Sequence, residues 1–316
     1  MPTKILIFLF SIISTLSWAE TTVDMLQFKF QTKEESAQYL SLKDSYIENL
    51  SVLDLSLYHS TKETISILEH LDFLKTTTLD WTDEEKEKLN QMIVNFKETV
   101  SKLALKVTFP DEVKLIKTNG QDAFNSHYTR GDAIIFPASN NLIATDLATF
   151  YHEMFHIFSR FHPEKSDELY SLIGFKRIPR LQIPSDFEKM RTTNPDAFYY
   201  EHSLTIKKLD QEFEVVPVMY SAITQDQING PVNEAAVYRL GLFDLNSFQS
   251  TKRIFFKVAD TNYKEVVKAN THYYIHPEEI MAEDFKLLLL QNTKDEKAPT
   301  VRYQEVIDQL KELLTR

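Results

Sequence analysis

The stretch from Leu142 to Arg160 constrains the fold of this chain more than any other segment. Its apolar residues recur at positions i, i+3, i+4, i+7, i+8 and i+11, the pattern of an α-helix with one buried face. They are Leu147, Phe150, Tyr151, Met154, Phe155 and Phe158. The other side carries His152 and His156 among small residues, as expected for the floor of a cleft rather than for a solvated surface.

His152, Glu153 and His156 form a His-Glu-x-x-His motif on this helix. Residues four apart lie one turn above each other, so two imidazoles can reach one tetrahedral ion while the intervening carboxylate turns toward a bound water. The motif predicts a hydrolytic zinc site with Glu153 as general base. A pair of surface histidines beside a glutamate is the alternative interpretation.

A catalytic zinc usually takes three protein ligands, so this site needs one more. His162 completes the spacing of the metzincins, but Ser159 stands where that family has glycine, and a left-handed turn is costly for serine. Glu279 is the preferred candidate. It forms an i, i+4 pair with Glu283, and two like charges at this spacing repel unless a cation compensates them.

We therefore predict that Glu279 binds the zinc ion and that Glu283 accepts a hydrogen bond from a ligand histidine. The alternative is a solvated acidic first turn of the helix that begins at Pro277, because acids are favoured there by the helix dipole. Capping alone accounts for Glu278. The sequence leaves open whether Glu278 or His162 replaces Glu279 as the third ligand.

The pair of motifs, His152-Glu-x-x-His156 and Glu279-x-x-x-Glu283, resembles the gluzincins, in which a glutamate on a downstream helix completes the zinc site. An acid four residues later, usually aspartate, orients a histidine in that family. The gap of 123 residues (279 − 156) is unusually long for it. Four stretches are also similar to a family of uncharacterised exported bacterial proteins, and they are residues 155–160, 169–175, 193–197 and 270–279. The resemblance spans most of residues 150–290 and implies a zincin-like catalytic domain.

Residues 1–19 are a predicted signal peptide. Lys4 supplies the positive charge, Ile5 to Ile13 is the apolar core, and Ser17-Trp18-Ala19 fits the pattern before a cleavage site. No later segment approaches the ~20 apolar residues that span a bilayer. We expect a soluble mature protein beginning near Glu20, without a stable membrane anchor, in the periplasm or outside the cell.

Composition excludes several classes of function. The chain has no cysteine, which rules out disulfides, a lipid-modified cysteine anchor, thiol catalysis and thiolate metal ligands. Its 35 basic and 46 acidic residues give a net charge of −11, which argues against a nucleic-acid or anionic-membrane partner. Neither feature specifies an oligomeric state.

The pattern along the chain predicts a helix-rich α+β fold. A helical N-terminal region, residues 20–110, precedes a zincin-like catalytic domain, residues 111–316. A capping box at Thr82 begins one helix of the N-terminal region. Strands are expected at residues 113–117, 133–136, 204–208, 213–220 and 235–243, and helices at 277–290 and 301–314. The sequence does not decide whether the N-terminal region is a prosegment, or whether strand 133–136 is an edge or an internal strand.

Together these features predict an exported zinc metallopeptidase that hydrolyses a peptide or protein substrate. Five residues are candidates for stabilising the oxyanion of the transition state, namely Tyr220, His202, Tyr273, Tyr274 and His276. Two alternatives remain, a zincin fold kept as a catalytically inactive binding module, and a zinc hydrolase that acts on a non-protein amide.

Overall fold

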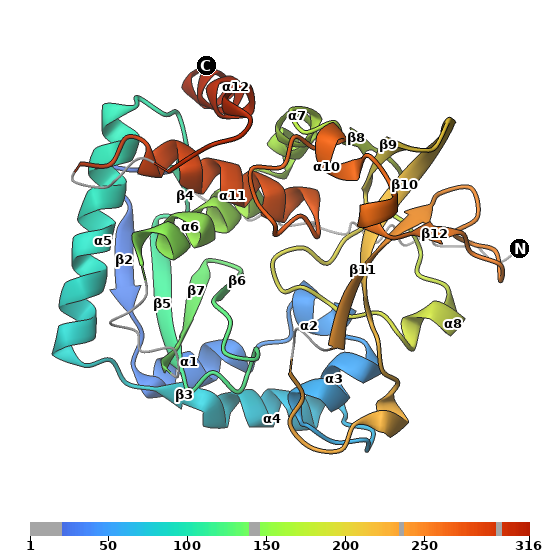
Figure 1. The fold of residues 1–316 in the computed structure, drawn as a ribbon. Helices are drawn as coiled ribbons and strands as arrows, with labels where there is room; N and C mark the ends of the chain where they lie inside the picture. Colours follow the sequence, from blue (N-terminus) through green and yellow to red (C-terminus); the bar gives the residue numbers. More distant parts are fainter. Residues whose placement is uncertain (1–20, 139–145, 234–236, 295–298) are drawn as a thin grey trace, which may run out of the picture.

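Two β-sheets organise the fold (Figure 1). The computed structural model describes residues 21–138, 146–233, 237–294 and 299–316. About 42% of the chain is helix and 19% is strand, which agrees with the predicted helix-rich α+β class.

The first sheet has the strand order β2-β5-β7-β6. Strands β2, β5 and β7 are parallel, whereas β6 runs antiparallel to β7 and forms the edge of the sheet. The strands are β2 (Gln27–Phe30), β5 (Glu112–Thr118), β6 (Tyr128–Arg130) and β7 (Ala133–Pro137), and the short β3 (Thr78–Leu79) pairs with the far end of β5. The strand predicted at residues 133–136 is therefore internal.

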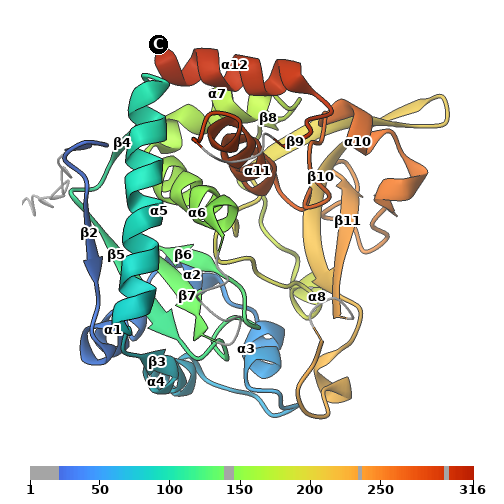
Figure 2. The same ribbon diagram turned by 60° about the vertical axis from the view of Figure 1, so that its left-hand side comes forward.

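Helices cover both faces of this sheet, as the burial of its strands requires. Leu115 and Phe136 face one cluster with the helices α5 (Asp83–Lys102) and α6 (Leu147–Phe161), which lie side by side in Figure 2. Ile116 and Ile135 point the other way, into a second cluster. That cluster contains side chains from α1 (Lys33–Leu40), α2 (Ser45–Asn49), α3 (Val52–Tyr58) and α4 (Ile67–Thr77).

The second sheet is antiparallel, with the order β12-β11-β10-β9-β8. Its strands are β8 (Lys176–Arg177), β9 (His202–Lys208), β10 (Gln211–Ser221), β11 (Tyr238–Asp244) and β12 (Phe255–Phe256). The strands predicted within residues 204–243 all lie here. This sheet occupies the part of the chain between α6 and α11 (Pro277–Leu290).

Short elements complete the fold. They are β1 (Thr21–Thr22), which pairs with β4 (Thr108–Phe109), α7 (Ser166–Ser171), α8 (Ser185–Glu188), α10 (Tyr263–Val266) and the 3₁₀ turns Pro163–Lys165, Gln225–Gln227 and Val258–Asp260. The last helix, α12 (Gln304–Thr315), begins three residues after the predicted start at Val301.

The N-terminal region is continuous with the rest of the molecule. The predicted capping box at Thr82 starts α5, where the Thr82 hydroxyl accepts from the backbone of Glu85 and the Glu85 carboxylate accepts from that of Thr82. The region also contributes strand β2, which the sequence analysis did not predict. Because β2 pairs with β5, the boundary predicted at residue 110 would divide the strands of one sheet between two regions.

Some predictions fall on residues outside the described ranges. These are the signal peptide, the start of the helix predicted from Leu142, and the start of the strand predicted from Ala235. Within the described ranges, no helix is both long enough and apolar enough to span a bilayer.

Candidate metal centre

Two helices from distant parts of the chain carry the predicted site residues. Asp146 caps the first helix, α6, by accepting a hydrogen bond of 2.8 Å from the Thr149 amide. The predicted apolar face of α6 is buried throughout. His276 caps α11 by accepting from the Glu278 amide at 3.1 Å, and Pro277 occupies the first helical position as predicted. Helices α6 and α11 pack side by side (Figures 1 and 2).

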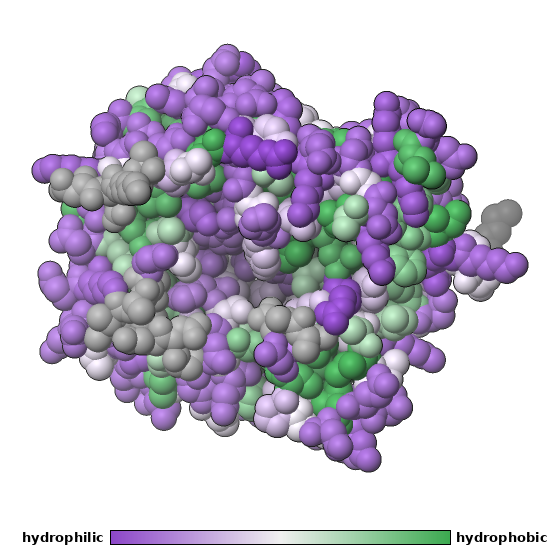
Figure 3. All heavy atoms as spheres, viewed as in Figure 1, coloured by the Kyte–Doolittle hydropathy of each residue, from purple (hydrophilic) through white to green (hydrophobic). Residues whose placement is uncertain are grey.

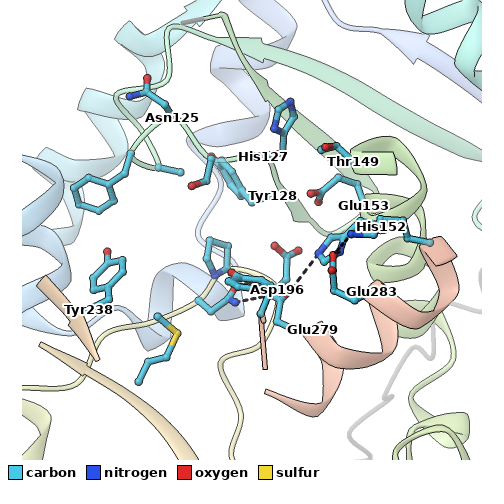
Figure 4. A pocket seen from close by; sticks show the side chains of 18 of the residues that line it. Asn125, His127, Tyr128, Thr149, His152, Glu153, Asp196, Tyr238, Glu279 and Glu283 are labelled. Atoms are coloured by element: carbon cyan, nitrogen blue, oxygen red, sulfur yellow. Dashed lines mark hydrogen bonds and ion pairs between the residues drawn. The ribbon is translucent and has the colours of Figure 1, made fainter. Parts of the chain in front are cut away.

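Three side-chain atoms converge between these helices. His152 Nε2 lies 3.0 Å from His156 Nε2 and 3.1 Å from Glu279 Oε2, and His156 Nε2 lies 3.5 Å from the same oxygen. Tetrahedral zinc with bonds of ~2.0–2.1 Å separates its ligand atoms by about 3.3 Å. The triangle therefore has the dimensions of three vertices of a zinc coordination tetrahedron, and Figure 4 shows two of its members, His152 and Glu279, side by side.

The outer ring nitrogens of both histidines face carboxylates. His152 Nδ1 lies 3.0 Å from Glu283 Oε1, and His156 Nδ1 lies 2.7 Å from Glu278 Oε1. When each Nδ1 donates its proton to a carboxylate, both Nε2 atoms of the neutral rings present lone pairs to each other. Two lone pairs at this distance repel, whereas a cation between them, a proton or a metal ion, would bind both.

Glu278 has a role that the sequence analysis missed. Capping was a sufficient explanation for an acid in the first turn of α11, yet the carboxylate is buried and accepts hydrogen bonds from His156, Ser159 and Tyr170. It orients His156 as Glu283 orients His152. The Ser159 hydroxyl thus contacts Glu278 rather than the cleft.

The second oxygen of Glu279 is held by Asn194, whose Nδ2 donates to Oε1 at 2.5 Å. Asn194 Oδ1 in turn accepts from the Asp196 amide at 2.9 Å. The Asp196 carboxylate lies near Glu153 and His156 and accepts from Thr129 and Arg160. The composition of Asn194-Pro195-Asp196 is that of a turn, and nothing local in the sequence signals its contact with a helix 85 residues away.

The segment Arg191–Asp196 is fixed from the N-terminal region. Thr193 donates to Asp54 on α3 through its amide at 3.0 Å and its hydroxyl at 2.6 Å. Ser51 donates to the Arg191 carbonyl at 2.9 Å, and the Arg191 guanidinium donates to the Asn49 carbonyl at 2.6 Å. The N-terminal region therefore supports the segment that holds Glu279.

Several carboxylates surround the two histidines, and their negative charges shift the pKa values of the site. Burial alone would lower the pKa of His152, but its hydrogen bonds to Glu279 and Glu283 raise it to about 9. Burial would also lower the pKa of His156, but the negative charges of Asp196 and Glu279 outweigh it and raise this pKa well above its usual value. Burial would raise the pKa of Glu279, yet the two imidazoles hold it well below its usual range. This concentration of carboxylates favours any bound cation, whether proton or metal.

Glu153 lies beside the triangle with only 4% of its surface exposed. Burial, reinforced by the charge of Asp196, raises its pKa to about 8. Its Oε2 atom is buried without a hydrogen-bond partner among the described residues. Such an atom is costly to bury, which indicates a missing polar partner such as a water or a substrate group.

A cavity of about 460 Å³ opens above these residues. His152, Glu153 and Glu279 line one end of it, and Tyr238 lies across from them (Figure 4). The surface is visibly hollowed near the centre of the face shown in Figure 3. The predicted cleft floor is therefore observed in part, since Ala148, Thr149 and His152 line the cavity, whereas His156 is buried and is not among its lining residues.

Of the five oxyanion candidates, Tyr273 lines this cleft, with its ring centroid 6.4 Å from that of His152. The others lie elsewhere. His202 and His276 line a second cavity, Tyr220 packs against Phe243 and Phe255, and Tyr274 packs against Tyr263. His127, which the sequence analysis did not single out, also lines the cleft, and burial lowers its pKa to about 4.

His162 is not placed to bind the same ion. It ends α6, where Nε2 lies 2.8 Å from the Thr108 hydroxyl and Nδ1 lies 2.9 Å from Glu164. Its contacts fasten the end of α6 to β4.

Comparisons of the chain with protein-family models, with curated proteins and with solved structures give no match. The functional interpretation therefore depends on the site itself.

Proposed function

We propose that this chain is an exported zinc-dependent metallopeptidase of the gluzincin type with a zincin-like core. The observation that carries the proposal is the convergence of His152 Nε2, His156 Nε2 and Glu279 Oε2 within 3.0–3.5 Å of one another. These three residues would hold the ion. Glu283 and Glu278 would orient the two histidines, as carboxylate partners of ligand histidines commonly do.

When bound, Zn²⁺ supplies Lewis acidity that activates a water and polarises a peptide carbonyl. Glu153 supplies the base. Its buried, unpartnered oxygen is available to accept the proton of an attacking water and to pass it to the leaving amine. A nearby dication would lower the pKa of Glu153 from its raised value, because it stabilises the carboxylate, and so would keep the base ionised.

Tyr273 is the proposed oxyanion donor. It lines the cleft beside His152, and its phenol can donate a hydrogen bond to the oxygen on which charge develops. The substrate is proposed to be a peptide or protein, since the surface is hollowed near the centre of the face shown in Figure 3. Export through the predicted signal peptide would place the enzyme in the periplasm or outside the cell.

The decisive experiment compares the wild-type protein with Glu153→Gln. We expect both to bind one zinc ion, measured by elemental analysis, and the variant to lose about 10²–10⁴-fold in kcat on quenched fluorescent peptides. Glu164→Gln is the matched control, because Glu164 is exposed and pairs with His162 outside the cleft. It should retain full activity.

Two results would contradict the proposal. Undiminished activity in Glu153→Gln would show that Glu153 is not the general base. Zinc-loaded wild-type protein that cleaves no peptide of a diverse library would favour a binding module or a hydrolase of non-protein amides. Intact mass of the exported protein separately tests the signal peptide, since we expect a chain that starts at Glu20.

A further inference from the structure

Aromatic side chains form the end of the cleft opposite the metal centre. The Tyr58 ring lies 5.1 Å from that of Phe124, which lies 5.9 Å from that of Tyr238. Met219 also lines the cavity. These residues come from α3, the loop before β6, β11 and β10, so four distant segments build one apolar surface beside a polar, acidic centre.

The loop that carries Phe124 is backbone-strained. Phe124 and Asn125 both adopt left-handed conformations, with φ of 52° and 64°. Side chains other than glycine rarely adopt this conformation, and it persists only where the surroundings enforce it. Here the Asn125 amide donates to the Gly120 carbonyl at 2.8 Å, and Tyr128 donates to the buried Asp122 at 2.8 Å. Strain of this kind gathers at ligand-binding sites.

The rings are held firmly yet are not fully covered. Tyr58 is buried, and its hydroxyl lies 2.9 Å from that of Tyr46, which fixes the ring. Phe124 and Tyr238 are half-buried, because each packs one side on a hydrophobic cluster and lines the cleft with the other. A preorganised apolar wall of this kind binds an apolar group without reorganising first.

We infer that this aromatic wall, formed by Tyr58, Phe124, Tyr238 and Met219, binds a large apolar or aromatic side chain of the peptide substrate. The inference rests on the proposed peptidase function, because the wall and the metal centre share one cavity. A peptide whose carbonyl lies at the metal centre would place a neighbouring side chain on the wall. The enzyme would therefore select Phe, Tyr or Leu at one fixed position relative to the cleaved bond.

The test uses the zinc-loaded mature protein and matched peptides that differ at one position, with Phe, Leu, Ala or Asp. We expect kcat/KM to favour Phe over Ala by roughly 10–100-fold, as hydrophobic pockets do. Phe124→Ala and Tyr238→Ala should each reduce this ratio severalfold. Phe255→Ala is the control, because Phe255 is an exposed aromatic residue on β12 outside the cleft, and it should leave the ratio unchanged.

Each outcome has one interpretation. Cleavage without a preference for apolar side chains, or a preference that survives in both variants, overturns this inference and leaves the peptidase proposal standing. Failure of wild-type protein to cleave any peptide overturns the peptidase proposal, and this inference with it. Phe124→Leu keeps an apolar side chain at the strained position, so it should lower the ratio less than Phe124→Ala if either alanine variant proves unstable.

Discussion

Replacing Asp54 by asparagine should weaken zinc binding although the residue lies outside the cleft lining. Asp54 receives three hydrogen bonds on two oxygens, from the amide of Ser51 and from the amide and hydroxyl of Thr193. The two backbone amides point at different oxygens. An asparagine has only one acceptor oxygen, so its NH₂ group must face one of these N–H donors.

The magnitude follows from that mismatch. One buried backbone N–H loses its acceptor, which costs about 1–3 kcal/mol, and the negative charge that faces Arg191 is also lost. We expect a total loss of about 2–4 kcal/mol in the free energy of unfolding. Because Thr193 adjoins the Asn194 that holds Glu279, zinc affinity should fall about 10-fold, the size typical of a lost supporting contact.

The assay combines urea unfolding, followed by circular dichroism, with zinc affinity from chelator competition. Asp44→Asn is the matched control. Asp44 also lies in the N-terminal region and receives a backbone N–H, from Ile47, and a buried guanidinium, from Arg130. It should lose stability and keep its zinc affinity. Equal zinc affinities for Asp54→Asn and the wild type would refute the reasoning that α3 supports the metal centre.

Three further predictions concern buried carboxylates and the ion. Burial, opposed by a hydrogen bond from Asn270, raises the pKa of Asp284 to about 7. Its contribution to stability is thus fully present below about pH 4 and is lost as the pH rises through 7, on the order of 4 kcal/mol in all. In Asp284→Asn, the Tm measured by thermal melts should therefore change less between pH 4 and 8 than in the wild type. The same dependence of Tm on pH in both proteins would contradict this. Glu278→Gln keeps an acceptor for His156 but removes the charge, so chelator competition should show a loss of about 10-fold or more in zinc affinity, and an unchanged affinity would exclude that role. Chelation of the zinc-loaded protein should lower Tm by several degrees, since an ion at ~1,000 times its Kd stabilises by about 4 kcal/mol, whereas a Tm insensitive to chelator and to added zinc would exclude a tightly bound ion.

The parts of the fold that the sequence predicted are those with local signals. Helix α6 has a helical repeat of apolar residues, α11 begins with Pro277, and α5 begins with a capping box. Strand β7 is a short apolar run, and β5 has Val113, Leu115 and Ile116 interspersed with lysines. In each case the determining interactions lie within a few residues of one another, so the pattern is visible along the chain.

The features that the sequence did not predict depend on long-range contacts. Strand β2 has only four residues and is stabilised by pairing with β5, about 85 residues away. Asn194 is a turn residue in the sequence, and its role appears only where the turn meets Glu279. Glu278 satisfied a local rule for helix ends, which concealed its contact with His156. Polar residues of loops carry no periodicity, so their partners have to be found in space.

The order in which the chain is made also affects the candidate site. Both histidines belong to α6, but Glu279 follows His156 by 123 residues (279 − 156), and the whole antiparallel sheet is encoded between them. During synthesis, therefore, the imidazole pair exists long before its carboxylate does. The proposed ion could be held by all three ligands only after the segment that carries Glu279 has been synthesised, and a chain shortened to end at His276 should lose metal affinity although it keeps the motif on α6.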